Sequence, residues 1–205
     1  MSGTERPARI ELMDALRGLA VCLMVLHHFL YDLCEFLGAP WWLFTNPVFD
    51  VLHYFFAGLF IFLSGISSDF SRSNLKRGAK AMALALGITL VTYFMDMTIV
   101  FGVLHLLGVC MMLYPVYKKL PTQALAAMGV VLVVTGYLIS GTVVEAKFLF
   151  PFGFAYEGFA SSDYFPLLPH LGWYMLGTVL GRTVYADKKT RLPGTFRESA
   201  IARFF

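Results

Sequence analysis

Long apolar runs recur along this chain, and they restrict its fold more than any other feature. A helix that crosses a lipid bilayer needs about 20 predominantly apolar residues. Six runs approach or reach that length, over residues 12–36, 49–66, 79–97, 100–117, 122–140 and 165–183. Hydrophobic residues make up 58% of the 205 residues and charged residues only 14%, whereas soluble domains carry about 25% charged residues to keep their surface hydrated. The sequence therefore predicts an integral membrane protein.

The same runs predict a single all-α, polytopic domain over residues 1–205 with about six transmembrane helices. No alternating pattern persists long enough for a β-barrel, and helices satisfy every backbone group inside lipid. The first run continues past Leu30 without a small-residue cleavage site, so we expect a permanent span rather than a signal peptide. The three cysteines, Cys22, Cys34 and Cys110, lie within apolar runs and indicate neither a disulfide framework nor a metal site.

Basic residues are distributed very unevenly between the two sides that six spans define. If the N-terminus lies in the cytoplasm, Lys147 is the only one of 16 Lys and Arg residues on the outer side. The residues on the inner side include Arg6, Arg9, Arg17, the basic residues of 72–80, and those from Arg182 to Arg203. The positive-inside rule therefore predicts that both termini are cytoplasmic. A net charge of only +3 gives no reason to expect a nucleic acid as partner.

Five histidines fall in one predicted layer of the membrane. At 1.5 Å per residue, His27 and His28 lie about 22 Å along the first span from its cytoplasmic start. His53, His105 and His170 lie about 7 Å below the outer surface, in spans that descend from it. Ionisable groups inside a membrane are costly and are therefore functional candidates. The alternative is that amphipathic side chains collect near the interface for solvation alone.

Two of these histidines have a carboxylate one helical turn away. His28 and Asp32 are spaced i, i+4, and Asp50 and His53 are spaced i, i+3, so each pair shares a helix face. A carboxylate that orients an imidazole is the arrangement of a general base. A polar pair that only stabilises the helix has the same spacing. No spacing of histidine, cysteine and glutamate indicates a metal site, and we expect no metal.

Basic residues near the cytoplasmic side suit the phosphates of a nucleotide. Arg17 lies eleven residues before His28, about 16.5 Å along a helix. The pantetheine arm of coenzyme A fits that distance, although an interfacial ion pair with Asp14 is the alternative role for Arg17. Three further cations in the segment 71–80 are candidate phosphate ligands or ordinary positive-inside anchors. They are Arg72, Lys76 and Arg77.

These motifs resemble those of related membrane enzymes. Leu16–Ala20, preceded by Asp14 and followed by His28, is similar to the first helix of the transmembrane acyltransferase superfamily, with the spacing of its acyltransferase-three branch. The rest resembles the heparan-alpha-glucosaminide N-acetyltransferase catalytic-domain family in its small bacterial form. The motifs that carry this resemblance are FIFLSG at 60–65, FGVLH at 101–105 and DYFPLLP at 163–169. Together the resemblance covers about residues 9–182.

The resemblance implies a transmembrane N- or O-acetyltransferase of a bacterial cytoplasmic (inner) membrane. Members take an acetyl group from cytosolic acetyl-CoA and deliver it to a sugar on the other side, which in the heparan-type enzymes is the amine of a terminal glucosamine. The implied partners are the lipid bilayer, the coenzyme A thioester and an amino-sugar or other sugar acceptor, and a homodimer is compatible with them. Relatives commonly carry a further hydrophobic helix beyond the position of Phe205.

The resemblance also implies roles for single residues. Arg17 matches the motif arginine and His28 the motif histidine. In the animal heparan enzymes asparagine replaces that histidine, and the catalytic histidine lies in the loop after the first helix, which here contains none. We therefore expect His28, oriented by Asp32, to be the first acid–base candidate. The second is His53 with Asp50, and the residues expected at the oxyanion or acceptor site are His27, His105, His170 and Asp163.

The outer segment 148–164 is rich in aromatic residues and contains Glu157. Ring stacking and carboxylate contacts suit a cationic amino sugar, while an interfacial aromatic belt has the same composition. Two other classes of function compete with acetyl transfer. One is a small-solute or proton-coupled transporter that uses the histidine layer as a relay, and the other is a non-catalytic membrane partner.

Overall fold

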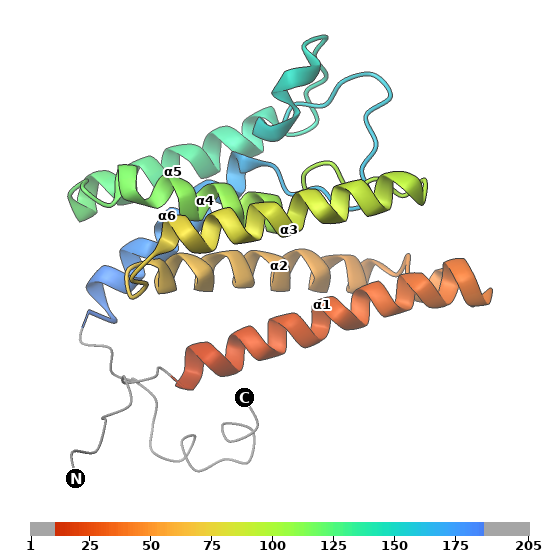
Figure 1. Ribbon diagram of the computed structural model, residues 1–205, viewed down its shortest axis with the longest axis horizontal. Coiled ribbons are helices and arrows are strands. Elements are labelled where there is room, and N and C mark those ends of the chain that lie inside the picture. The colour runs from red at the N-terminus through yellow and green to blue at the C-terminus, as the bar shows by residue number, and fades with distance from the viewer. Residues whose placement is uncertain (1–10, 187–205) are drawn as a thin grey trace. The chain divides into compact units, whose positions relative to one another are not determined.

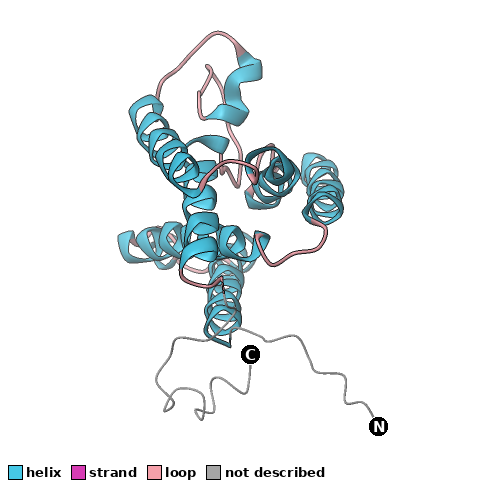
Figure 2. Cartoon of the chain, turned by 90° about the vertical axis from the view of Figure 1, so that its left-hand side faces the viewer, coloured by secondary structure: helices cyan, strands magenta, loops and turns pink. Residues whose placement is uncertain are grey.

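The computed structural model describes residues 11–186, which form helices joined by loops (Figure 1). The α-helices are α1 (Glu11–Leu37), α2 (Pro47–Ser68), α3 (Asn74–Phe94), α4 (Val103–Tyr117), α5 (Thr122–Ile139) and α6 (Leu167–Thr183). Two short 3-10 helices lie in the loops, η1 (Trp41–Leu43) and η2 (Lys147–Phe152). No strand occurs among residues 11–186, as Figure 2 shows, so the predicted all-α class is confirmed.

Each predicted apolar range corresponds to one α-helix, and the boundaries differ where polar residues take part. The helix α3 begins at Asn74 rather than at 79, because it includes a polar and basic first turn that precedes the apolar run. The helix α3 ends at Phe94 rather than at 97. Two residues later, Asp96 has a φ of 56°, which a right-handed helix does not allow. The helix α4 begins at Val103 rather than at 100, because Phe101 instead forms a backbone bridge with Tyr164.

Three helices within residues 11–186 are long and apolar enough to cross a membrane by length and composition, namely Leu12–Leu37, Pro47–Ser68 and Thr122–Ile139. The helix α4 is also apolar but has only 15 residues. Large apolar side chains are widely exposed, and Phe94 and Leu138 reach 77% and 78% exposure. Such a surface is suited to lipid rather than to water. The basic residues at 6, 9 and 188–203, on which the predicted orientation partly depends, lie outside the described residues.

The chain divides into two compact units at a point within α2. One unit contains α1, η1 and α2 as far as Leu63, and the other contains Ser64–Arg182. In the first unit, Arg17 of α1 contacts the carbonyl of Leu63, and His27 contacts His53. From Arg17 to His27 the residue number in α1 rises, whereas from Leu63 to His53 the residue number of the partner in α2 falls. The helices α1 and α2 therefore run antiparallel in this unit.

The second unit depends on close helix crossings. A Cβ atom at Gly78 of α3 would lie 2.8 Å from the carbonyl oxygen of Gly108 in α4, closer than carbon and oxygen pack. Only glycine therefore permits this approach of α3 to α4. The last turn of α2 is joined to α6 through a hydrogen bond of 2.8 Å from Ser68 Oγ to the hydroxyl of Tyr174.

One arginine joins three segments of the second unit. Arg182, at the end of α6, donates from Nε to Asp69 Oδ1 at 3.3 Å. Its other nitrogens donate to the carbonyls of Leu120 and Lys118 at 3.0 and 2.9 Å, just beyond the C-terminus of α4. The hydroxyl of Tyr114 donates to the same Asp69 oxygen at 2.6 Å. A cation at the carbonyl end of a helix stabilises that end.

Candidate active site

Two imidazoles from different helices stack on each other in the first unit. The rings of His27 in α1 and His53 in α2 lie 4.1 Å apart between centroids and only 23° from parallel. Phe44, just after η1, packs on the same His27 ring at 4.8 Å. Two imidazolium ions in face-to-face contact would repel, so this arrangement favours at most one positive charge on the pair. The partner that remains neutral can act as a base.

A small cavity lies beside this pair. Its volume is about 30 Å³, which is room for about two water molecules. The wall consists of His27 and His53 together with seven apolar residues of α1 and α2, namely Leu23, Met24, Leu26, Phe49, Leu52, Phe56 and Ala57. The two imidazoles are the only titratable side chains in the lining of this hollow.

Arg17 lies on the same helix as His27, closer to the N-terminus. It forms an ion pair with Asp14 at 3.4 Å and donates to the carbonyl of Leu63 at 3.3 Å. The side chain therefore bridges α1 and α2 at the end nearer the start of α1. Ten residues separate Arg17 from His27, about 15 Å along the helix, which is close to the length predicted for a pantetheine arm between a phosphate and the reacting thioester.

The predicted pair His28 and Asp32 does not form a hydrogen bond among the described residues, and both side chains are exposed. Consecutive residues on a helix point about 100° apart, so the rotation that brings His27 onto His53 turns His28 away. Asp50 is also exposed, in the first turn of α2 and one turn before His53.

In the second unit, His105 is buried and both of its ring nitrogens are hydrogen-bonded. The backbone N–H of Gly102 donates to Nδ1 at 3.3 Å, so that nitrogen carries no proton. Nε2 then holds the proton and faces Thr89 Oγ1 at 3.2 Å, while this hydroxyl donates to the carbonyl of Ile99 at 2.6 Å. These hydrogen bonds connect α3, the following loop and the first turn of α4. His105 therefore holds the start of α4 against α3.

His170 has the opposite proton arrangement. Its Nδ1 lies 2.7 Å from the carbonyl of Pro166, and a carbonyl can only accept, so the proton is on Nδ1. Nε2 is left with its lone pair, as in a general base held in one tautomer by a backbone carbonyl. The ring of Phe165 packs against the imidazole edge to face at 5.2 Å.

Asp163, which the sequence predicts at the oxyanion or acceptor site, lies at the start of α4. Its Oδ2 accepts a hydrogen bond of 3.2 Å from the N–H of Val103, one of the amides that the helix itself leaves unsatisfied. A carboxylate at that end also stabilises the helix dipole. The neighbouring Ser161 hydroxyl accepts from the N–H of Val100 at 3.1 Å. Sequence reasoning missed this capping, because the cap is 60 residues away from the helix that it stabilises.

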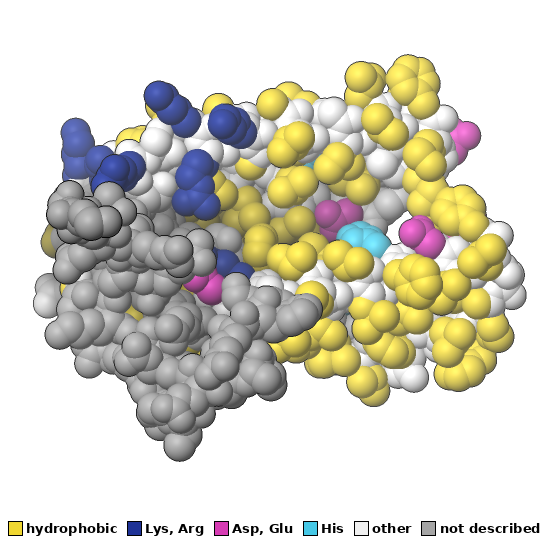
Figure 3. All heavy atoms as spheres, turned by 60° about the horizontal axis from the view of Figure 1, so that its bottom comes forward, with side chains coloured by type: hydrophobic (Ala, Val, Ile, Leu, Met, Phe, Trp, Pro, Cys, Tyr) yellow, Lys and Arg dark blue, Asp and Glu magenta, His cyan; other side chains and the backbone are white. Residues whose placement is uncertain are grey.

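The basic residues predicted to bind phosphates lie around the beginning of α3. Arg72, Lys76, Arg77 and Lys80 are all exposed, and no acidic residue occurs between 70 and 80. Figure 3 shows Lys and Arg side chains gathered towards one end of the face drawn, with hydrophobic side chains over much of the remainder. The N-terminus of a helix attracts anions through its unpaired amides and its dipole. This part of the chain therefore suits a phosphate group.

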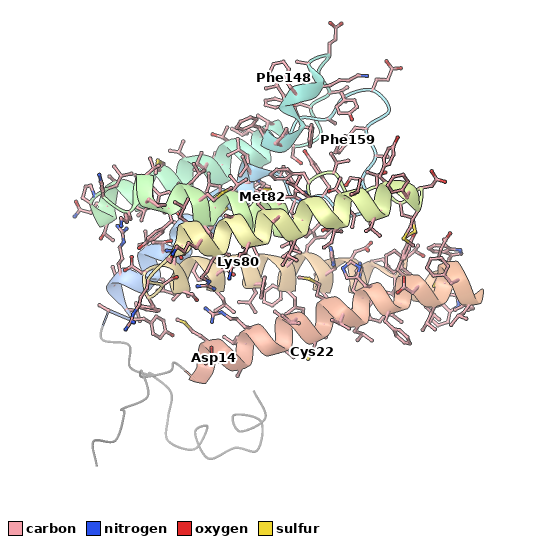
Figure 4. The ribbon with its side chains drawn as sticks, in the orientation of Figure 1. Asp14, Cys22, Lys80, Met82, Phe148 and Phe159 are labelled. Carbon is pink, nitrogen blue, oxygen red and sulfur yellow. The ribbon has the colours of Figure 1, made fainter. Side chains whose placement is uncertain are left out.

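The aromatic residues of the outer segment pack largely on one another. Phe159 contacts Phe150, Tyr156 and Tyr164 at centroid distances of 5.9, 5.1 and 4.8 Å. Figure 4 labels Phe148 and Phe159 in this loop between α5 and α6. Within residues 11–186, no group of three or more His, Cys, Asp or Glu side chains is arranged to hold a metal ion.

The chain matches the model of a known protein family. The family described as heparan-alpha-glucosaminide N-acetyltransferase, catalytic, matches the chain over residues 9–204, a range that contains all of the helices described above. No curated protein and no solved structure matches the chain.

Proposed function

This chain belongs to the heparan-alpha-glucosaminide N-acetyltransferase catalytic family, and from that premise we propose how its residues carry out acetyl transfer in a membrane. The apolar helices support a location in a membrane, and family membership supports an acetyltransferase. We propose that the acetyl group comes from cytosolic acetyl-CoA, the co-substrate of this family, and passes to an amino sugar on the extracytoplasmic side. The membrane in this proposal is a bacterial inner membrane, crossed six times with both termini inside.

In this proposal Arg17 binds the acetyl donor, acetyl-CoA. Its guanidinium binds a phosphate of coenzyme A. Arginine suits this contact because the guanidinium is always charged and can donate two hydrogen bonds to one phosphate. The exposed cations at the start of α3, Arg72, Lys76 and Arg77, are separate candidates for a phosphate contact, as the sequence predicts. With a phosphate at Arg17, the extended arm reaches about 15 Å along α1 and brings the thioester to the cavity beside His27.

His53 is the proposed acid–base residue, and His27 holds it in place. Its imidazole removes a proton from the acceptor amine as the nitrogen attacks the thioester carbonyl. The C–N bond forms, the C–S bond breaks, and the imidazolium returns the proton to the departing thiolate. The observation that supports this assignment is the stacked contact of His27 with His53 at the wall of a cavity. The neutral Nε2 of His170 makes it a second base candidate, and His28 with Asp32 is the alternative from the motif spacing.

The experiment compares histidine variants of the purified full chain, with glucosamine and acetyl-CoA as substrates and thiol release as readout. We expect His53→Ala to lower kcat/KM by about 100- to 10,000-fold, the usual contribution of a general base. The matched control, His28→Ala on the exposed face of α1, is expected to keep most of the activity. Thermal unfolding of each variant establishes that the fold is retained.

Two results would contradict parts of this proposal. Loss of activity in His28→Ala with retention in His53→Ala would transfer the base role to His28 and leave acetyl transfer intact. Absence of thiol release with any amino sugar, combined with uptake of a solute into vesicles, would favour a transporter instead.

A further inference from the structure

The size of the cavity beside His27 and His53 bears on which acyl group the chain can transfer. Its volume is about 30 Å³. Cavities that bind apolar ligands give a scale, because about 150 Å³ accommodates a benzene molecule, or about 25 Å³ for each carbon atom. A volume of about 30 Å³ therefore holds one methyl group and leaves no room for a second carbon. We call this hollow the histidine cavity.

The histidine cavity lies entirely within the unit that contains α1 and the first part of α2. Apart from the two imidazoles, its lining is apolar. On α1, Leu23 and Met24 precede His27 by one helical turn, and on α2, Phe56 and Ala57 follow the second histidine by one turn. Because the two helices run antiparallel, these four side chains lie at one level, on the side of the imidazoles nearer the start of α1.

Burial identifies the bottom and the rim of the histidine cavity. Ala57 is 1% exposed and lies at the bottom, whereas Leu26 and Leu52 are 44% and 38% exposed and lie at the rim. The side chain of Ala57 is the smallest in the lining, so a larger residue at this position would occupy the space. The histidine cavity therefore depends on an alanine in α2.

We propose that the histidine cavity receives the methyl group of the acetyl donor and so limits the transferred acyl chain to two carbons. This inference rests on the proposed function, in which the thioester carbonyl lies beside His53. With the carbonyl at the imidazole, the methyl group of an acetyl thioester fills the cavity. A propionyl thioester would press one more carbon against Phe56 and Ala57. Family membership supports an acetyl donor, whereas this inference names the side chains that exclude longer ones.

The test compares acetyl-, propionyl- and butyryl-CoA as donors for the purified full chain in detergent. Glucosamine is the acceptor and thiol release is the readout. For the wild type we expect kcat/KM for propionyl-CoA to be about 10- to 200-fold below that for acetyl-CoA, the usual effect of one methylene in a hydrophobic pocket. Butyryl-CoA is expected to react more slowly still.

Two variants enlarge the histidine cavity from opposite helices. Met24→Ala in α1 and Phe56→Leu in α2 remove equal numbers of side-chain atoms, and each is expected to raise the propionyl-to-acetyl ratio of kcat/KM by about tenfold or more. The matched control is Phe55→Leu, since Phe55 is 61% exposed and does not line the cavity. The control is expected to leave the ratio unchanged. A ratio measured on one preparation does not depend on how much of that preparation is folded.

Ala57→Val tests the opposite change. The additional methyl groups of valine fill the histidine cavity, so kcat/KM for acetyl-CoA is expected to fall by about tenfold or more. Free coenzyme A has no acyl group, and its Kd is expected to stay unchanged in this variant.

The results that overturn this inference differ from those that overturn the proposed function. Equal kcat/KM for acetyl- and propionyl-CoA in the wild type would show that the acyl chain extends towards lipid rather than into the histidine cavity. A ratio that neither Met24→Ala nor Phe56→Leu changes would also reject the inference, and acetyl transfer would stand in both cases. Absence of thiol release with every acyl-CoA would instead reject the proposed function, and this inference with it.

Discussion

At the scale of single residues, two histidines with similar sequence surroundings have different chemistry. His105 accepts from the backbone of Gly102 through Nδ1 and faces a hydroxyl through Nε2, so its ring stabilises the turn before α4. His170 gives its Nδ1 proton to the carbonyl of Pro166 and keeps the Nε2 lone pair. The difference depends on which backbone group each ring meets. Of the two, His170 is therefore the one prepared to accept a proton.

Tyr164 provides a prediction at this scale, in the loop before α6. Burial raises the pKa of Tyr164 from 10.0 to about 12, and its hydroxyl donates to the carbonyl of Phe150. Because the folded pKa lies above the unfolded one, the contribution of Tyr164 to stability is complete below pH 10. It is lost as the pH rises from about 10 to about 12.

The measurement compares the unfolding free energies of the wild type and Tyr164→Phe in detergent from pH 8 to pH 12. At pH 8 we expect the variant to be less stable by about 1 kcal/mol, the usual value of one hydrogen bond. We expect this difference to shrink above pH 10, since the other tyrosines are common to both proteins. A difference that stays constant up to pH 12 would contradict the prediction.

At the scale of elements, both ends of α4 depend on residues from remote segments. Asp163 accepts from the first turn of the helix, and Arg182 donates to the carbonyls just beyond its last turn. With 15 residues α4 is about 22 Å long, shorter than the apolar core of a bilayer at about 30 Å. Satisfied ends therefore matter more for α4 than for α1 or α2, whose ends extend further.

The contact between α2 and α6 gives a prediction about packing. A Cβ atom at Gly65 would overlap the carbonyl oxygen of Tyr174, and Thr178 Oγ1 donates to the carbonyl of Gly65 at 3.2 Å. Gly65→Ala therefore forces the two helices apart. We expect a loss of about 1–3 kcal/mol in stability, the usual cost of overpacking.

Thermal unfolding in one detergent checks this expectation. The control is Gly87→Ala in α3, where an added Cβ meets nothing within 4 Å. Alanine has the higher helix propensity, so the control is expected to be neutral or more stable by up to about 1 kcal/mol. Equal melting temperatures for the two variants would show that α2 and α6 are not in close contact in the protein.

At the scale of the whole molecule, the number of membrane crossings decides where the chain ends. The helices α1, α2 and α5 are long and apolar enough to cross by themselves. If only these three crossed, the end of α6 would lie opposite to the N-terminal side. Six crossings, as the apolar runs and the basic residues predict, place the two on the same side. The side of the membrane on which a residue just after α6 lies therefore shows whether the number of crossings is even or odd.

Cysteine labelling of intact cells measures this parity. In a variant with Cys22, Cys34 and Cys110 replaced, we expect Ala186→Cys to be protected from an impermeant maleimide until the membrane is opened. Phe148→Cys, in the exposed loop between α5 and α6, is expected to react from outside and serves as the control. Labelling of Ala186→Cys in intact cells would reject six crossings with cytoplasmic termini.

The sequence by itself determined the class and the positions of the helices. Every apolar run became an α-helix, because a chain in lipid must satisfy its backbone locally, and local composition decides where it does so. The family was also accessible from short motifs such as FGVLH at 101–105. The exceptions were helix ends, for example at α3 and α4, where polar first turns and a backbone bridge shift the boundary by a few residues.

Only the tertiary structure decided which polar side chains meet. His27 rather than His28 contacts His53, because neighbouring residues on a helix point about 100° apart and the rotation of α1 against α2 selects one of them. Asp163 and Arg182 stabilise α4 from distant parts of the chain, and no local pattern encodes such a contact. Residue type and spacing limit the candidates, whereas the packing of one helix on another assigns their partners.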